Sequence, residues 1–197
     1  MPQSTNANRY YHNYAYERTA YSKGAVFLGQ LSYIVGKEKV FEILQTYYNE
    51  WKFKHPLPND LRRIAERISG IQLQWFLTDW TQTTNTINYS IDAVEEAMAG
   101  TTIRLKRKEV MPMPLEILIQ YKNGEIELHY IPISLMRGEK ENPYGLEWKI
   151  QPDWTWANLD YSFTIDKEKN QIEAIVIDPS NLMADIDKTD NFYVAPK

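Results

Sequence analysis

The chain has 197 residues, of which 43% are hydrophobic, and it carries a formal net charge of −4. This composition is typical of a folded globular protein. It offers no basic footprint for nucleic acid and no apolar run near the roughly 20 residues that span a bilayer. The lack of cysteine excludes disulfides, thiolate catalysis and Cys-ligated zinc, and it leaves the cellular compartment open.

The first part of the chain reads as a leader followed by helices. Residues 1–15 form a polar leader without the charged and apolar regions of a signal peptide. Within residues 16–82, apolar side chains recur at helical spacing, as at Phe27, Leu31 and Ile34. The pattern predicts helices over residues 24–35, 38–51, from Asn59 or Asp60 to 69, and 73–80.

After the polar stretch 81–85 the apolar period changes from 3.6 to 2, which indicates strands. Asn123-Gly124 lies between two such strands and accepts the positive φ angles of a tight hairpin. Strands are expected near residues 87–91, 103–105, 117–121, 126–130, 156–165 and 172–177. The sequence therefore predicts an α+β protein, with a short helical segment followed by an antiparallel β-sandwich over residues 83–197.

The helical segment is small for a domain that is stable alone. Its four amphipathic helices carry much aromatic surface, which would normally pack on further protein. From this alone we expect additional polypeptide upstream of the chain.

Two tyrosines, Tyr16 and Tyr21, precede the first strongly apolar helix. A phenol, with a pKa near ~10, stays protonated at neutral pH and can donate a hydrogen bond to an oxyanion formed at a peptide carbonyl. The alternative is that both are packing residues in a chain with fourteen tyrosines.

The stretch Tyr21-Ser22-Lys23-Gly24 resembles the Tyr-x-Lys-Gly segment of aminopeptidase N-type zinc peptidases, the gluzincin family. Further landmarks follow in the family's order, and the resemblance extends to about residue 180. These landmarks are Gly36, Phe41, Tyr47-Tyr48, Ser69-Gly70, Trp75-Phe76, Trp80, Ile87-Asn88-Tyr89, Pro112 and Pro114.

The resemblance implies that the chain is the C-terminal part of a metallopeptidase that removes N-terminal residues from peptides. Tyr21 would stabilise the tetrahedral intermediate, and Tyr16 would line the pocket. The family's zinc-binding His-Glu-x-x-His is absent here, so zinc is implied for the intact parent enzyme only. The chain itself would hold no cofactor, would pack on an upstream catalytic domain and would be inactive alone; an exported enzyme is favoured over a cytosolic one.

The three histidines, His12, His55 and His129, also indicate that this chain has no zinc site of the family's type. No two are one helical turn apart, so the chain cannot build a thermolysin-type zinc site. We expect His129 to be an exposed strand residue, and His55 to be structural rather than part of a substrate groove. The carboxylates of residues 178–187 lack the spacing of a calcium loop and are expected to form plain turns.

A second hypothesis is a non-catalytic module that binds peptide or carbohydrate through aromatic side chains. Trp148, Trp154 and Trp156 are the candidates for such a patch, because aromatic faces offer rigid contact area. The plainer interpretation, which we favour, is that these tryptophans fill the core and the ends of the sandwich.

Overall fold

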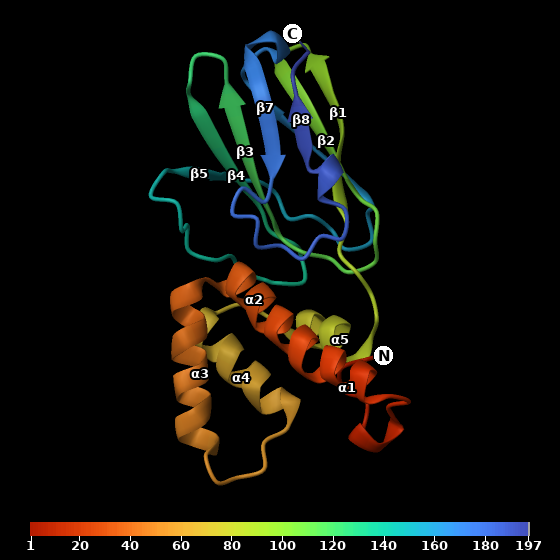
Figure 1. Ribbon diagram of the computed structural model, residues 1–197. Helices are drawn as coiled ribbons and strands as arrows, with labels where there is room; N and C mark the ends of the chain where they lie inside the picture. Colours follow the sequence, from red (N-terminus) through yellow and green to blue (C-terminus); the bar gives the residue numbers. More distant parts are fainter. Residues whose placement is uncertain (197) are drawn as a thin grey trace. The chain divides into compact units, whose positions relative to one another are not determined.

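The computed structural model describes residues 1–196 and confirms the α+β fold (Figure 1). The chain divides into two compact units. A helical unit comprises residues 1–85 together with 135–143, and a strand-rich unit comprises residues 86–134 together with the chain from 144 onward.

The helical unit contains every helix that the sequence predicts. The first of the predicted helices, expected over residues 24–35, begins at Lys23. The elements of this unit are a 3₁₀ turn Ala7–Arg9, α1 Asn13–Glu17, a π-helical turn Arg18–Ser22, α2 Lys23–Val35, α3 Lys37–Trp51, α4 Pro58–Ser69 and α5 Gln74–Gln82. The apolar stripe of α2 is buried as expected, and Phe27 stacks on Phe76 of α5 with ring centroids 4.8 Å apart. Burial of these apolar faces is the main force that holds the helices together.

The start of α4 shows how local chemistry sets a helix boundary. Leu57 occupies the N-cap position and Pro58 begins the helix, so the cap is neither Asn59 nor Asp60. Asp60 instead reaches back, and its carboxylate accepts a hydrogen bond from the Leu57 N–H at 2.8 Å. Proline suits the first turn because that turn has no partner for its N–H groups.

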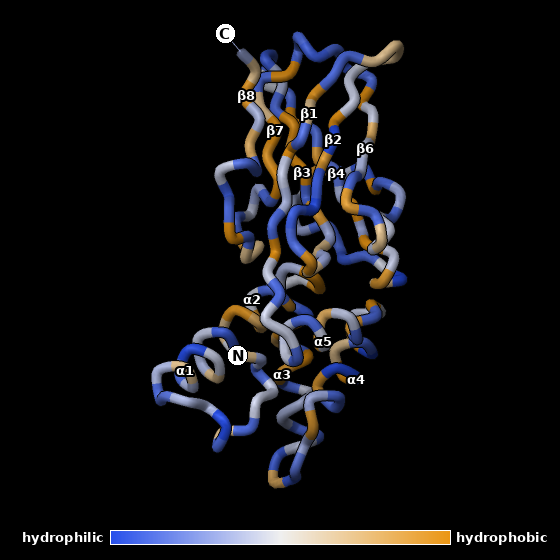
Figure 2. Tube along the Cα trace, turned by 90° about the vertical axis from the view of Figure 1, so that its right-hand side faces the viewer, coloured by the Kyte–Doolittle hydropathy of each residue, from blue (hydrophilic) through white to orange (hydrophobic). Residues whose placement is uncertain are grey.

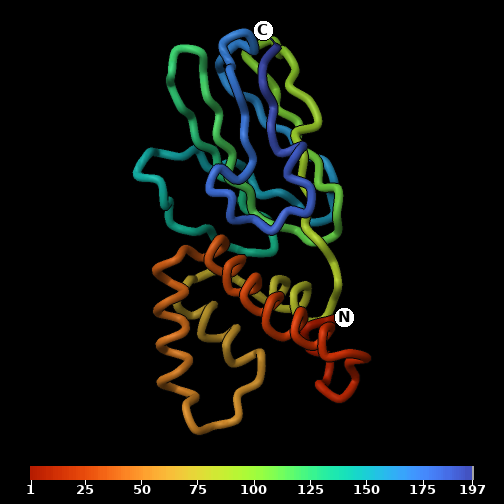
Figure 3. The backbone as a smooth tube through the Cα atoms, in the orientation of Figure 1, coloured from red at the N-terminus to blue at the C-terminus, as the bar shows by residue number. Residues whose placement is uncertain are grey.

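The N-terminal residues are tied to the helices. The Ser4 N–H donates to the Thr81 carbonyl at the end of α5 (2.8 Å), and the Tyr10 hydroxyl donates to the Pro2 carbonyl (3.4 Å). In Figure 3 this segment, drawn in red, folds back beside the helices that follow it. Composition alone gave no sign of these contacts.

Residues 135–143 return to the helical unit after four strands have been made, which the sequence analysis did not predict. The Gln72 N–H donates to the Met136 carbonyl (2.8 Å), and buried Lys140 donates to the Tyr33 carbonyl at the end of α2 (2.8 Å). The Lys140 ammonium also lies 4.6 Å from the Tyr33 ring centroid, a cation–π contact.

The strand-rich unit has two sheets. Its strands are β1 Tyr89–Ala97, β2 Gly100–Arg107, β3 Leu115–Tyr121, β4 Ile126–Ile131, β5 Trp148–Ile150, β6 Asp160–Ile165, β7 Ile172–Ile177 and β8 Phe192–Val194. One sheet has the order β1-β2-β6 and the other β5-β4-β3-β7-β8. The expectation of purely antiparallel pairing was too simple, because β4 and β5 are parallel.

The core of the strand-rich unit lies where β3 and β7 pair. Figure 2 shows much of both strands in orange, the colour of hydrophobic residues. Ile117, Ile119 and Ile175 are fully buried there. The predicted hairpin between β3 and β4 is confirmed, since Gly124 has φ +85° and its N–H donates to the Tyr121 carbonyl (2.9 Å). In the described part of the chain, no helix has the length and apolar character needed to cross a bilayer.

Candidate functional site

The backbone between Tyr16 and Tyr21 departs from α-helical geometry. Tyr16 lies in α1, and Tyr21 lies in the π-helical turn Arg18–Ser22. There the Lys23 N–H donates to the Arg18 carbonyl, five residues back. In a regular α-helix, residues five apart point about 140° away from each other. The wider π turn brings them to one face, and such turns are frequent at functional sites.

The two tyrosine rings are in contact as a result. Their centroids are 6.0 Å apart with an interplanar angle of 88°, and the Tyr10 ring also contacts that of Tyr16, with centroids 5.5 Å apart and an angle of 82°. Edge-to-face packing of this kind is a favoured aromatic geometry. A hydrogen bond with the Tyr21 side chain, and secondly the proximity of that phenol, raise the pKa of Tyr16 above its ordinary value.

Tyr21 is the more accessible of the pair, with 67% of its surface exposed. Its phenol can therefore meet a carbonyl oxygen that approaches from outside the helical unit. Sequence reasoning selected both tyrosines, but it gave no sign that their side chains touch, because the π turn has no recognised sequence signature.

Lys23 and Gly24 follow Tyr21, and the lysine has a structural contact. Its ammonium donates to the Thr83 carbonyl (3.0 Å), at the C-terminal end of α5, and lies 5.9 Å from the Trp80 ring centroid. Burial lowers the pKa of Lys23. A cation at a helix C-terminus is electrostatically favourable. Lys23 therefore links the first turn of α2, next to Tyr21, to the C-terminal end of α5.

His129 is buried, which makes the expectation of an exposed strand histidine wrong. It is 1% exposed because β4 is flanked by β3 and β5, and its ring packs on Phe163 of β6 with centroids 4.8 Å apart. Its Nε2 lies 2.8 Å from Glu127 Oε1, and its Nδ1 lies 2.9 Å from Gln151 Nε2. Burial lowers the pKa of His129, and Glu127 opposes that effect.

The described residues do not fit a zinc ion. Within residues 1–196, no three side chains among His, Asp and Glu gather in a way that could hold a metal. His12 precedes α1, His55 lies between α3 and α4, and His129 lies in β4, so no two share an element.

The acidic residues near the C-terminus act within turns. Asp178 accepts hydrogen bonds from Ser180 Oγ (2.6 Å) and the Met183 N–H (2.7 Å). Asp185 accepts from the Tyr89 N–H (3.0 Å) and Asn191 Nδ2 (3.3 Å). Asp178 thus stabilises its own turn, as expected of a plain turn. Asp185 does more than that, because it also binds the backbone at Tyr89, the first residue of β1.

The three tryptophans do not form one exposed patch. Trp154 is 3% exposed and stacks on Tyr161 with ring centroids 5.1 Å apart. Trp148 stacks on Tyr130 at 4.6 Å, whereas Trp156 is half exposed. At least one of the residues proposed for a binding surface therefore belongs to the core.

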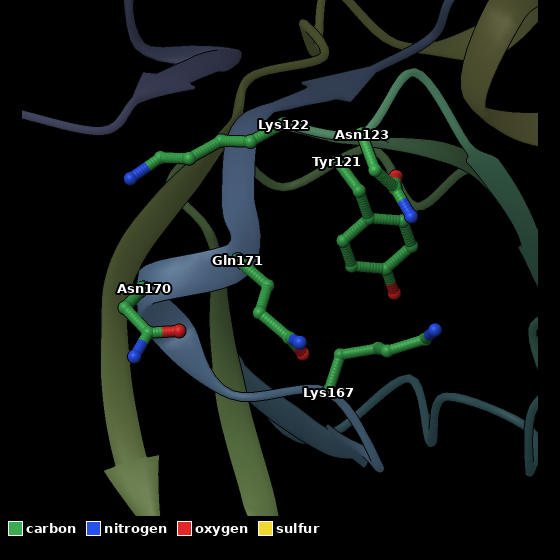
Figure 4. A pocket seen from close by; sticks show the side chains of 6 residues that line it. All are labelled: Tyr121, Lys122, Asn123, Lys167, Asn170 and Gln171. Carbon is green, nitrogen blue, oxygen red and sulfur yellow. The ribbon is translucent and has the colours of Figure 1, made fainter.

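A polar hollow of about 240 Å³ opens between the β3–β4 and β6–β7 turns (Figure 4). It is lined by Tyr121, Lys122, Asn123, Lys167, Asn170 and Gln171. The Lys167 ammonium lies 5.5 Å from the Tyr121 ring centroid and 3.2 Å from Glu125 Oε2. Both partners of Lys167 therefore come from the β3–β4 hairpin.

Comparison with known families agrees with the tyrosine segment. Residues 3–80 match the model of the peptidase family M1 domain, a range that contains Tyr16, Tyr21 and α2. No curated protein matches the chain. The match supports a metallopeptidase origin for the helical unit. The matched family is M1, so the match supports a relationship to the aminopeptidase N-type enzymes, which the Tyr-x-Lys-Gly resemblance also implied.

Proposed function

We propose that the chain is the C-terminal part of a zinc-dependent aminopeptidase of the M1 type, which removes N-terminal residues from peptides. The observation that carries the proposal is the exposed phenol of Tyr21, presented by a π-helical turn inside the segment that matches the family. Its hydroxyl donates a hydrogen bond to the oxyanion that forms at the peptide carbonyl.

The exposed side of α2 supports the proposed packing on an upstream catalytic domain. Phe27, Leu31 and Ile34 are buried on one side of this helix, yet Val26 on another side is 41% exposed. Gly29 is exposed as well. A helix that is apolar on most of its circumference is normally covered on most of it. Further polypeptide over this side would bury apolar surface next to Tyr21.

The same domain would supply the parts that residues 1–196 lack. No histidine pair of the required spacing is present, so the zinc ligands and the general base belong to the upstream part in this proposal. The chain alone is then expected to bind no zinc and to have no peptidase activity.

The proposal is tested in the product of the full reading frame. We expect a His-Glu-x-x-His helix upstream of Met1, and we expect Tyr21→Phe to lower kcat about 10²–10³-fold, the effect of losing one oxyanion donor. Zinc content should stay unchanged. Tyr14→Phe, which removes another exposed phenol from the same region, is the matched control and should keep full activity.

Two results would overturn the proposal. One is a complete reading frame without the zinc-binding helix. The other is a Tyr21→Phe enzyme that contains zinc and turns over peptide substrates as fast as the unaltered enzyme.

A further inference from the structure

Lys23 makes two hydrogen bonds that bear on the place of Tyr21. Its backbone N–H donates to the Arg18 carbonyl and closes the π turn in which Tyr21 lies. Its ammonium donates to the Thr83 carbonyl (3.0 Å), 60 residues further along the chain. One residue therefore completes the turn that carries the exposed phenol and also connects that turn to the C-terminal end of α5.

The acceptor of the ammonium is itself held in place. Thr83 Oγ1 donates to the Asp79 carbonyl of α5 (2.6 Å) and accepts a hydrogen bond from the Asn85 N–H (3.1 Å). Trp80, which lies under the ammonium with its ring centroid 5.9 Å away, is only 6% exposed. The end of α5 is thus a well-anchored support for the Lys23 side chain.

The π turn needs such a support more than an α-helical turn does. Turns of this kind are rare, and regular α-helical hydrogen bonding is the usual alternative. A change between the two would rotate one side of the turn against the other by about 100°, the angle of one residue. Rotation of the first turn of α2 would take the Lys23 ammonium away from the Thr83 carbonyl, so the hydrogen bond between them opposes it.

We propose that Lys23 is a positioning residue for Tyr21, because its hydrogen bond to Thr83 fixes the first turn of α2 and so keeps the phenol at the place where the substrate oxyanion forms. This inference rests on the proposed function. The effect is one of geometry, since a misplacement of about 1 Å can lower a rate about 10²-fold.

The support can be tested in the chain itself by hydrogen exchange. Lys23→Met keeps the aliphatic stem and removes the donor, so the amide of residue 23, which closes the π turn, should exchange about tenfold faster. Lys37→Met, at the exposed first residue of α3, should leave that amide unchanged. Unaltered exchange in Lys23→Met would show that the side chain does not hold the turn, and it would refute the proposal.

The role is tested by kinetics in the full-length enzyme, at a temperature where circular dichroism shows each variant folded. Lys23→Met should lower kcat about tenfold with KM and zinc content unchanged, because Tyr21 acts only in the transition state. The double variant Lys23→Met/Tyr21→Phe should be no slower than Tyr21→Phe alone. Lys23→Gln has a shorter side chain and the same expected result, and it serves if Lys23→Met does not fold.

Lys140→Met is the matched control, because it removes the same kind of bond from the same unit. The Lys140 ammonium donates to the Tyr33 carbonyl (2.8 Å), at the end of α2 that is remote in sequence from Tyr21. Its loss should leave kcat unchanged. A fall in kcat as large as that of Lys23→Met would mean that general loosening of the helices slows the enzyme, and it would overturn the positioning role.

The outcomes separate this inference from the proposed function. If Tyr21→Phe is slow while Lys23→Met keeps its full kcat, the proposed function stands and the positioning role falls. An additional loss in the double variant also rejects that role, because Lys23 would then act independently of Tyr21. A fully active Tyr21→Phe enzyme removes both proposals.

Discussion

Replacing Tyr89 by Phe should destabilise the strand-rich unit by about 2–4 kcal/mol. The Tyr89 hydroxyl is buried, accepts a hydrogen bond from the Met113 N–H (2.8 Å) and donates one to the Met113 carbonyl (3.1 Å). Phenylalanine keeps the ring and its edge contact with Trp154. It leaves two buried backbone groups without this partner, and each unsatisfied group costs about 1–3 kcal/mol.

Urea unfolding followed by tryptophan fluorescence measures this loss, and hydrogen exchange at the Met113 amide reports the contact directly. Tyr161→Phe is a suitable control, since the Tyr161 hydroxyl donates to the Pro152 carbonyl at an exposed position, and it should change stability by less than about 1 kcal/mol. If Tyr89→Phe unfolds like the unaltered chain and Met113 exchanges no faster, the reasoning about this buried pair is wrong.

Two further predictions concern Lys23 and His129. Lys23→Met keeps the aliphatic stem but loses the hydrogen bond to Thr83, and it should lower the stability of the helical unit by about 1–2 kcal/mol in thermal unfolding, the partial exposure of Lys23 limiting the effect. An equal loss in the exposed-site control Lys37→Met would contradict this. Burial lowers the folded-state pKa of His129, so the unfolded chain binds the proton first. The stability of the strand-rich unit should therefore decrease as the pH falls below the ordinary histidine pKa of about 6.5. His129→Gln should flatten this dependence between pH 7 and 5.5, and an unchanged slope would exclude His129 as its source.

Apolar periodicity predicted α2 to α5 because each of these helices buries one stripe of its own sequence. The hairpin at Asn123-Gly124 was predictable for a similar reason, since two residues specify the turn. His129 was misjudged because its environment depends on β5 and on Phe163 of β6, both distant in sequence. The sequence of β4 alone does not show that the strand has neighbours on both sides.

The candidate site was predictable in part. A four-residue motif selected Tyr21, but the contact with Tyr16 depends on a backbone hydrogen bond from residue 23 to residue 18. Residue propensities describe the α-helix and say nothing of where an additional residue widens a turn. The N-terminal anchors through Ser4 and Tyr10 depend on tertiary contacts in the same way.

The return of residues 135–143 to the helices has a consequence for synthesis of the protein. The helical unit is discontinuous in sequence, and the Tyr33 carbonyl receives its lysine partner only after residue 140 has left the ribosome. Until then α2 ends without that contact, while β1 to β4 are already available for pairing. The helices are thus translated first but completed late, and a shortened chain that stops at residue 85 would lack the segment that finishes them.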